Sequence, residues 1–141
     1  MSVDPLKDFP GYALRRASAT TMSILARKLA ALELRPTEAT VLMFIDANPN
    51  ITQSEIARML DMASANMAPL VSRLEGRDLL EREPVDGRSH GLSLSTAGRA
   101  LTSRVKKTLN AHEDALLAKV PAAQRSVFLS ALRALWADAE D

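Results

Sequence analysis

The sequence contains no cysteine, and this absence removes several classes of function at once. Disulfide frameworks, thiolate metal sites and cysteine-based redox sensing all require a thiol. Aromatic residues form only 4% of the chain, so the 47% of hydrophobic residues must build a mainly aliphatic, methionine-rich core. With 141 residues, the chain is long enough for one domain with such a core.

Long apolar runs are also missing. No run reaches the length of about 18 residues that a membrane-spanning helix needs. The first residues do not show the basic and then apolar pattern of a secretory signal peptide. We therefore expect a soluble cytoplasmic protein that has no membrane partner.

Motifs for catalysis are scarce as well. With only five glycines, the chain has neither a glycine-rich phosphate loop nor a nucleophile elbow. The two histidines, His90 and His112, have no neighbours at metal-ligand spacing, so we expect no metal and no cofactor. His112 lies on an apolar helical stripe and is expected in the core or at an interface. An enzyme is therefore not expected.

The stretch between Thr52 and Gly98 is the informative part of the chain. Thr52 and Glu55 have the spacing of a capping box, which predicts the start of a short helix. Ser64 is expected to cap a second helix, in which Pro69 is an awkward interior residue. Asp78 stands where that helix must end in a left-handed residue, a conformation that aspartate adopts at some cost.

A β-hairpin is predicted after this second helix. Leu80 and Arg82 alternate with two glutamates over 80–83, and two leucines alternate with two serines over 92–95. The connecting turn is Asp86, Gly87 and Arg88. Asn50 and Ile51 can add a short strand that pairs with this hairpin. Two helices followed by such a hairpin are the layout of a winged helix-turn-helix, which binds DNA through its second helix and its hairpin, or wing.

Several segments resemble the MarR family, the multiple-antibiotic-resistance regulators, and the resemblance covers essentially the whole chain. The most specific match is the Asp-x-Arg wing followed by a Leu-Ser-x-x-Gly helix start. The matching segments are Thr52–Ala57, Arg73–Leu74, Leu79–Arg82, Asp86–Arg88 and Leu94–Gly98.

This resemblance implies a mainly α fold with a small β-hairpin wing, in a single domain over residues 1–141. Residues 9–33 and 96–140 would form dimerisation helices around a DNA-binding lobe at 36–95. The implied function is a homodimeric transcriptional regulator, a repressor, that binds a pseudo-palindromic double-stranded DNA operator and is released by a small organic ligand. The apolar stripes on the terminal helices fit a dimer, because a small winged lobe cannot cover them and they need a partner surface.

The expected DNA contacts come from both helices and from the wing. Asn66 can bond an adenine edge, or it is a surface residue only. Arg73 either reaches a phosphate or pairs with Glu75 or Asp78. The full set of candidates is Thr52, Gln53, Ser64, Ala65, Asn66, Met67, Ser72, Arg73, Asp86, Arg88, Ser89 and His90.

In the resembling family, the wing aspartate holds the arginine or the wing backbone, and the arginine contacts the minor groove or a phosphate. These roles would fall on Asp86 and Arg88, although an ordinary solvated hairpin tip looks the same in sequence. His90 can add a backbone contact or stand as an exposed strand residue.

Tyr12, Arg15 and Arg16 are the candidate residues for a ligand. Many relatives bind aromatic acids between the dimer arms and the DNA-binding lobe, and arginine pairs naturally with a carboxylate. The reading we favour is plainer, with both arginines as surface charges or contacts to a second subunit.

Net charge does not favour DNA. Residues 52–99 hold six arginines and seven acidic residues, a net charge of −1. Binding must then depend on where individual arginines point. A winged-helix module that binds another protein and no DNA therefore remains the alternative.

Overall fold

The computed structural model describes residues 1–137, and the chain separates into two compact units, one of residues 1–108 and one that begins at Leu109. The division falls within the long helix α5. In chain order the elements are α1 (Pro10–Ala30), α2 (Pro36–Ala47), β1 (Ile51–Thr52), α3 (Gln53–Met59), α4 (Ser64–Gly76), β2 (Leu80–Pro84), β3 (His90–Leu94), α5 (Thr96–Ala118), the 3-10 turn η1 (Ala122–Gln124) and α6 (Arg125–Ala134).

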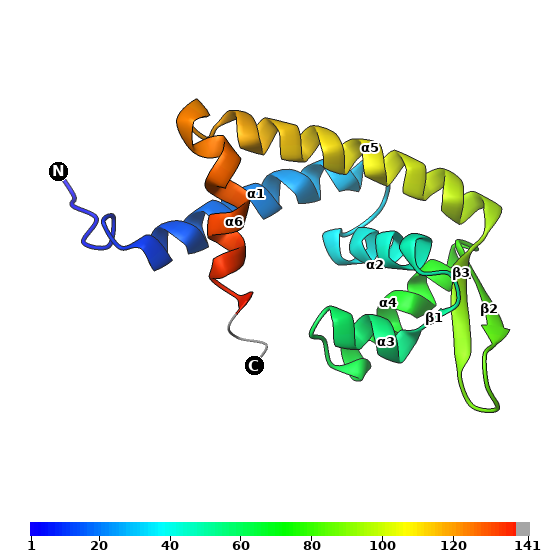
Figure 1. Ribbon diagram of the computed structural model, residues 1–141. Coiled ribbons are helices and arrows are strands. Elements are labelled where there is room, and N and C mark those ends of the chain that lie inside the picture. The colour runs from blue at the N-terminus through cyan, green and yellow to red at the C-terminus, as the bar shows by residue number, and fades with distance from the viewer. Residues whose placement is uncertain (138–141) are drawn as a thin grey trace. The chain divides into compact units, whose positions relative to one another are not determined.

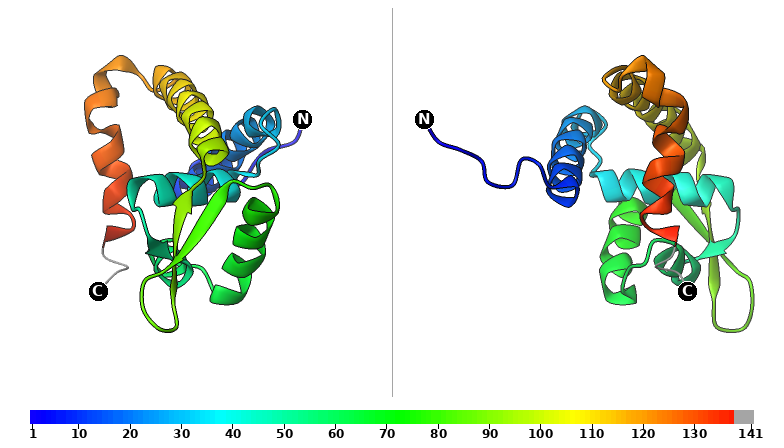
Figure 2. Two further views of the ribbon diagram at one scale, coloured as in Figure 1. Left: turned by 90° about the vertical axis from the view of Figure 1, so that its right-hand side faces the viewer. Right: turned by 60° about the vertical axis from the view of Figure 1, so that its left-hand side comes forward.

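The first unit is a winged helix-turn-helix, which confirms the predicted fold class (Figure 1). Its three strands form an antiparallel sheet in the order β1-β3-β2. Leu92 pairs with Ile51 on one side and with Arg82 on the other, so the short strand predicted near Asn50 exists. Two further views show the hairpin loop and the α3–α4 connection at the same end of this unit (Figure 2).

The core of the first unit is aliphatic, as the composition predicts. Helix α2 lies at its centre and packs against α1, α4 and β3. The completely or almost completely buried side chains are Leu29, Val41, Leu42, Ile45, Ile56, Met67, Val71, Leu74, Leu92 and Val105. Helix α1 contributes buried residues only from Leu25 onward, so its first four turns remain outside this core.

Helix α4 ends in the left-handed conformation expected at Asp78, which has φ 58°. The N–H of Leu79 donates to the carbonyl of Leu74 at 3.1 Å, and the N–H of Asp78 donates to Glu75 at 2.9 Å. This pair of bonds is the Schellman motif, which satisfies carbonyls at the helix end. A non-glycine residue in this conformation costs about 1 kcal/mol.

The start of α4 differs from the prediction. The helix begins at Ser64 itself, and Ala63 occupies the cap position without a side-chain hydrogen bond. Ser64 is therefore not the cap, because its own backbone is already helical, whereas Ala63 has the extended backbone of a cap residue with ψ 139°. Pro69 lies within the helix, which continues to Gly76 although proline supplies no N–H.

The chain after the hairpin turns directly into α5, and Ser95 caps that helix as predicted. Its Oγ accepts from the N–H of Gly98 at 3.0 Å and donates to the carbonyl of Asp78 at 2.7 Å. A Cβ on Gly98 would lie 2.1 Å from the carbonyl oxygen of Leu79. Glycine in this segment therefore lets α5 start against the chain that leaves α4.

The second unit holds the end of α5, η1 and α6. Pro121 precedes η1, so the last α-helix begins at Arg125 and not at Pro121. The Arg125 guanidinium donates to the carbonyls of Val120 and Ala118 at 2.8 and 3.1 Å and so caps α5. No residue of α6 is buried, and Trp136 just beyond it is 52% exposed. His112 is buried, as expected.

Candidate nucleic-acid interface

The capping box at the start of α3 forms as predicted. The N–H of Glu55 donates to the Thr52 hydroxyl at 3.2 Å, and the N–H of Thr52 donates to the Glu55 carboxylate at 2.8 Å. The second bond is the main cause that lowers the pKa of Glu55. Thr52 and Gln53 are half-buried, and the Thr52 hydroxyl is already engaged with Glu55.

Helix α4 has one buried and one exposed side. Met67, Val71 and Leu74 recur at spacings of four and three and are completely buried. The expected contact by Met67 is wrong in this structure, because a side chain with 0% exposure has no surface to offer DNA. The exposed candidates on α4 are Ser64, Ala65, Asn66, Ser72 and Arg73.

Arg73 pairs with neither of the acidic residues expected. Its guanidinium lies 3.6 Å from the carboxylate of Glu38 on α2, so the pairing with Glu75 or Asp78 was wrong. Glu38 is 1% exposed and also accepts the N–H of Arg35 at 3.1 Å. A buried carboxylate needs such compensation. Because 47% of the Arg73 side chain stays exposed, Arg73 keeps a surface that can face a phosphate.

The loop of the wing is ordered by Asp86. Its Oδ1 accepts from the N–H groups of Arg88 and Ser89 at 2.8 and 2.7 Å, and these bonds lower the pKa of Asp86. The N–H of Val85 donates to the Ser89 carbonyl at 3.1 Å and closes a five-residue loop. Gly87 does not adopt positive φ, so the connection is not a two-residue Asp-Gly turn.

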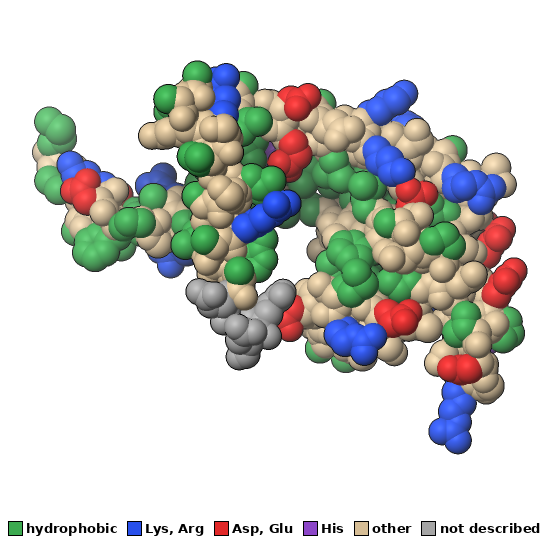
Figure 3. All heavy atoms as spheres, viewed as in Figure 1, with side chains coloured by type: hydrophobic (Ala, Val, Ile, Leu, Met, Phe, Trp, Pro, Cys, Tyr) green, Lys and Arg blue, Asp and Glu red, His purple; other side chains and the backbone are tan. Residues whose placement is uncertain are grey.

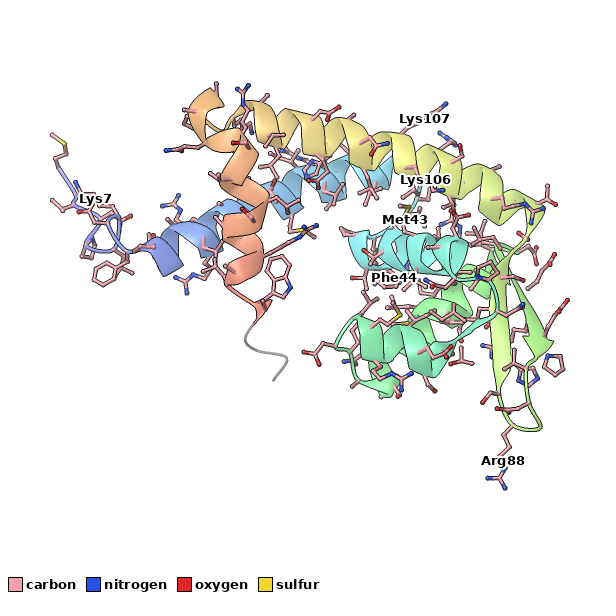
Figure 4. The ribbon with its side chains drawn as sticks, viewed as in Figure 1. Lys7, Met43, Phe44, Arg88, Lys106 and Lys107 are labelled. Carbon is pink, nitrogen blue, oxygen red and sulfur yellow. The ribbon has the colours of Figure 1, made fainter. Side chains whose placement is uncertain are left out.

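Arg88 points away from the body of the first unit at the end of this loop (Figure 4). It has no ion-pair partner within residues 1–137. Ser89 beside it is half-buried, and His90 is exposed at the start of β3, opposite Pro84. The wing therefore presents one free guanidinium on a backbone that Asp86 holds.

The wing is joined to α4 by an ion pair that sequence reasoning missed. The Arg82 guanidinium on β2 donates to both oxygens of Glu75, through Nε at 2.8 Å and Nη2 at 2.6 Å. The hydrogen bond from Arg82 lowers the pKa of Glu75. Bidentate pairs of this kind fix orientation as well as distance. Two charges seven residues apart, on different elements, have no local pattern that signals their contact.

Residues 52–99 have a net charge of −1, yet an arginine among them can still contact DNA, because several of the acidic side chains are engaged within the protein. Glu55, Glu75 and Asp86 are each engaged within the first unit, by a helix cap, an arginine and a loop backbone. The face shown in Figure 3 carries basic and acidic side chains side by side, without one continuous basic field. Contact with DNA would therefore depend on single arginines such as Arg88.

The three candidate ligand residues gather on the first turns of α1. The guanidinium carbons of Arg15 and Arg16 lie 5.4 and 5.8 Å from the centre of the Tyr12 ring, within cation–π range. Arg16 also lies 3.9 Å from the carboxylate of Asp4. An open surface cavity of about 310 Å³ is lined mainly by apolar residues, which are Leu6, Phe9, Pro10, Gly11, Tyr12 and Arg15.

Two other kinds of site are not found within residues 1–137. No group of three or more acidic or histidine side chains is placed to hold a metal ion. None of the described helices has the length and apolar character needed to cross a membrane.

Comparison with known proteins points to one family. A sequence model of the MarR family matches residues 32–89. The solved structure of the transcriptional repressor CouR bound to a 23-mer DNA duplex is 36% identical, with a TM-score of 0.86 over 96% of this chain and 97% of that one. CouR bound to p-coumaroyl-CoA is 33% identical, with a TM-score of 0.85 over 97% and 98% of the two chains.

Mycobacterial relatives agree with this assignment. An HTH-type transcriptional repressor of Mycobacterium bovis is 28% identical over 91% of this chain and 94% of its own length. A Mycobacterium tuberculosis MarR family protein in complex with salicylic acid is 28% identical, with a TM-score of 0.72 over 92% and 98% of the two chains. Its fold, its sequence and these full-length similarities place this chain in the MarR family of transcriptional regulators.

Proposed function

We propose that this protein is a transcriptional repressor that binds a pseudo-palindromic operator as a homodimer. The observation that carries the proposal is the pairing of an exposed α4 with a wing that presents a free Arg88 and is fixed to α4 by Arg82 and Glu75. The similarity to CouR, a repressor that was solved with bound DNA, supports the same role. The proposed partner is chromosomal DNA, which places the protein with the nucleoid in the cytoplasm.

The proposed contacts divide by chemistry. Asn66 reads a base edge in the major groove, where its amide can make two hydrogen bonds to adenine. Arg88 contributes charge at a phosphate or in a narrow minor groove. The remaining exposed or half-buried candidates position the lobe on the sugar-phosphate backbone. These positioning residues are Thr52, Gln53, Ser64, Ala65, Ser72, Arg73, Ser89 and His90, while Asp86 holds the wing loop.

The dimer is proposed to form through residues 9–33 and 96–140, which flank the lobe at 36–95 in the chain; residues 138–140 lie outside those that the structure describes. Apolar side chains stay exposed at both ends of the chain, among them Phe9 at 59%, Val127 at 57% and Leu135 at 66%. A second subunit that covers these side chains would remove them from water, and this supports the proposed dimer. We expect Leu132→Asp with Leu135→Asp to give monomeric or unfolded protein in sedimentation experiments. A well-folded monomer of the unaltered chain at micromolar concentration would rule this dimer out.

A small organic ligand is proposed to release the operator. Relatives have been solved with p-coumaroyl-CoA and with salicylic acid, so an aromatic acid or its thioester is the class to test. Arg15 and Arg16 beside Tyr12 would hold the acidic group. The ligand releases DNA only if it prefers the dimer geometry that does not fit the operator. Arg15→Ala or Arg16→Ala should keep operator binding but lose release by the probe; unchanged release in both moves the site elsewhere.

We propose no catalytic role for this protein. A gel-shift experiment with the DNA upstream of its own gene separates the repressor from a winged-helix module that binds only proteins. The expected result is a retarded complex of labelled operator. Unlabelled operator should displace the labelled operator from this complex, and scrambled DNA should not. No retardation of any DNA by the dimeric protein would leave the protein-binding module as the better account.

A further inference from the structure

The last turn of α4 connects the recognition helix to three different parts of the first unit. Arg73 lies against Glu38 of α2, and Glu75 pairs with Arg82 of β2. Arg77, the residue that follows the helix, reaches the end of α1. Residues 73, 75 and 77 therefore connect the end of α4 to α2, to the wing and to the end of α1.

Arg77 binds two main-chain carbonyls. Its Nη1 donates to the carbonyl of Glu33 at 2.7 Å, and its Nη2 donates to the carbonyl of Leu32 at 3.3 Å. The two carbonyls are adjacent, and the planar guanidinium can reach both at once. The link does not depend on a particular side chain on α1, because it uses backbone oxygens.

These carbonyls are available because α1 ends in a Schellman motif. The N–H of Leu34 donates to Leu29 at 3.2 Å, the N–H of Glu33 donates to Ala30 at 3.0 Å, and Glu33 has φ 55°. The carbonyls of Leu32 and Glu33 lie beyond these bonds and have no partner in the helix. A cation is also favoured at the negative end of the helix dipole.

The other end of the link is equally fixed. Arg77 precedes Asp78, whose left-handed conformation and bonds back to α4 close that helix. The guanidinium therefore joins two helix ends that each have a defined backbone. Two such ends joined by two hydrogen bonds resist a change in their separation more than a contact between mobile loops.

We propose that Arg77 is a positioning residue that sets the half-site spacing this regulator accepts. The inference depends on the proposed function, in which the N-terminal helix belongs to the dimer arm and α4 reads DNA. In a two-fold dimer, the distance between the two recognition helices then depends on how firmly each α4 is held to the helices of its own dimer arm, of which α1 is one. One added base pair moves a half-site by about 3.4 Å and by about one tenth of a turn. A loosely held α4 tolerates this displacement, whereas a firmly held one does not.

The test uses an operator selected from a randomised DNA pool with the unaltered protein. Two altered duplexes carry one base pair inserted or deleted between the half-sites. The measurement is the ratio of Kd for an altered duplex to Kd for the selected one. In Arg77→Gln this ratio should fall about five-fold, which is within the effect of single residues that couple two elements. Arg77→Lys should give an intermediate ratio, since an ammonium supplies the charge but not the planar fork.

Two control variants separate positioning from charge and from general loosening. Glu75→Gln removes the link from α4 to the wing, so it should weaken binding to all three duplexes by the same factor and keep their ratio. Lys7→Gln removes an exposed positive charge from the segment before α1, outside the proposed dimer segments and DNA contacts, and should leave the ratio unchanged (Figure 4). Circular dichroism on each variant confirms that the helices are retained.

The outcomes distinguish the two proposals. A lower ratio in Arg77→Gln that is partly restored in Arg77→Lys supports the positioning role. A folded Arg77→Gln protein with the unaltered ratio, or an equal fall in Glu75→Gln, overturns it. If Arg77→Gln does not fold, an unaltered ratio in Arg77→Lys overturns it too. If the unaltered protein selects no DNA at all, the proposed function fails before Arg77 is tested.

Discussion

Removing the Arg88 guanidinium tests whether the wing works by charge. Arg88 projects from a loop that Asp86 holds through two backbone hydrogen bonds, and Arg88 has no ion-pair partner within residues 1–137. Arg88→Ala therefore removes a charge without breaking an internal contact. We expect the fold and thermal stability to stay as they are, while DNA affinity falls for operator and unrelated DNA alike.

The magnitude follows from counterion release. Each phosphate contact steepens the dependence of log K on log salt by about 0.9, so one contact from each of two subunits contributes about 1.8. Between about 50 and 200 mM salt, the unaltered dimer should lose about 12-fold more affinity than the Arg88→Ala dimer. If Arg88 instead enters a narrow A·T-rich minor groove, the loss should be larger on duplexes that carry such a tract.

The assay is a titration of operator and scrambled duplexes over a salt series by fluorescence anisotropy. Lys7→Ala is the matched control, because it removes one exposed positive charge from a residue outside the lobe and outside the proposed dimer segments (Figure 4). Its salt slope should equal that of the unaltered protein. The wing assignment is wrong if Arg88→Ala keeps the original affinity and slope, or if Lys7→Ala changes the slope by the same amount.

Three further predictions concern other parts of the first unit. Asn66→Ala should cost about 1–3 kcal/mol per lost base contact on operator and spare scrambled DNA, measured in the same titrations; an equal loss on both would exclude base reading. Gly98→Ala should destabilise the protein by about 1–3 kcal/mol in urea unfolding, because its Cβ would lie 2.1 Å from a carbonyl oxygen. Gly76→Ala is its control, since a Cβ there meets nothing within 4 Å, and this variant should be as stable as the unaltered protein or more stable. The hydrogen bonds from the backbone lower the pKa of Asp86, so the loop should be fully ordered above the ordinary pKa of 3.8 and should lose this order as pH falls through the lower pKa of the folded protein. An NMR titration of Asp86 with a midpoint at or above 3.8 would contradict this.

Local features of the sequence predicted most of the secondary structure. The capping box at Thr52 depends on residues three apart, and the wing depends on alternation over a few positions. Asp78 in a left-handed conformation follows from the need to end α4 before a strand begins. Such features are readable because the interacting groups are neighbours in the chain.

The start of α4 could not be read in the same way. Ser64 is a good cap by residue type, yet the helix takes it in as its first residue. Met67 likewise belongs to the core and not to the DNA-facing side. A shift of one residue turns a helix by about 100°, so the buried side depends on how α4 packs against α2 and α3.

The sequence by itself therefore determined the type of module, the helix caps at Thr52 and Ser95, and the strands of the wing. The tertiary structure alone decided which charges are free and which are engaged. Arg77 and Glu33 are 44 residues apart, and Arg82 and Glu75 lie on different elements. Each of these arginines could equally have faced solvent, because nothing in its neighbouring residues specifies a partner. The relative placement of α1, α4 and the wing brings the partners within hydrogen-bonding distance, and that placement is set by the buried aliphatic core.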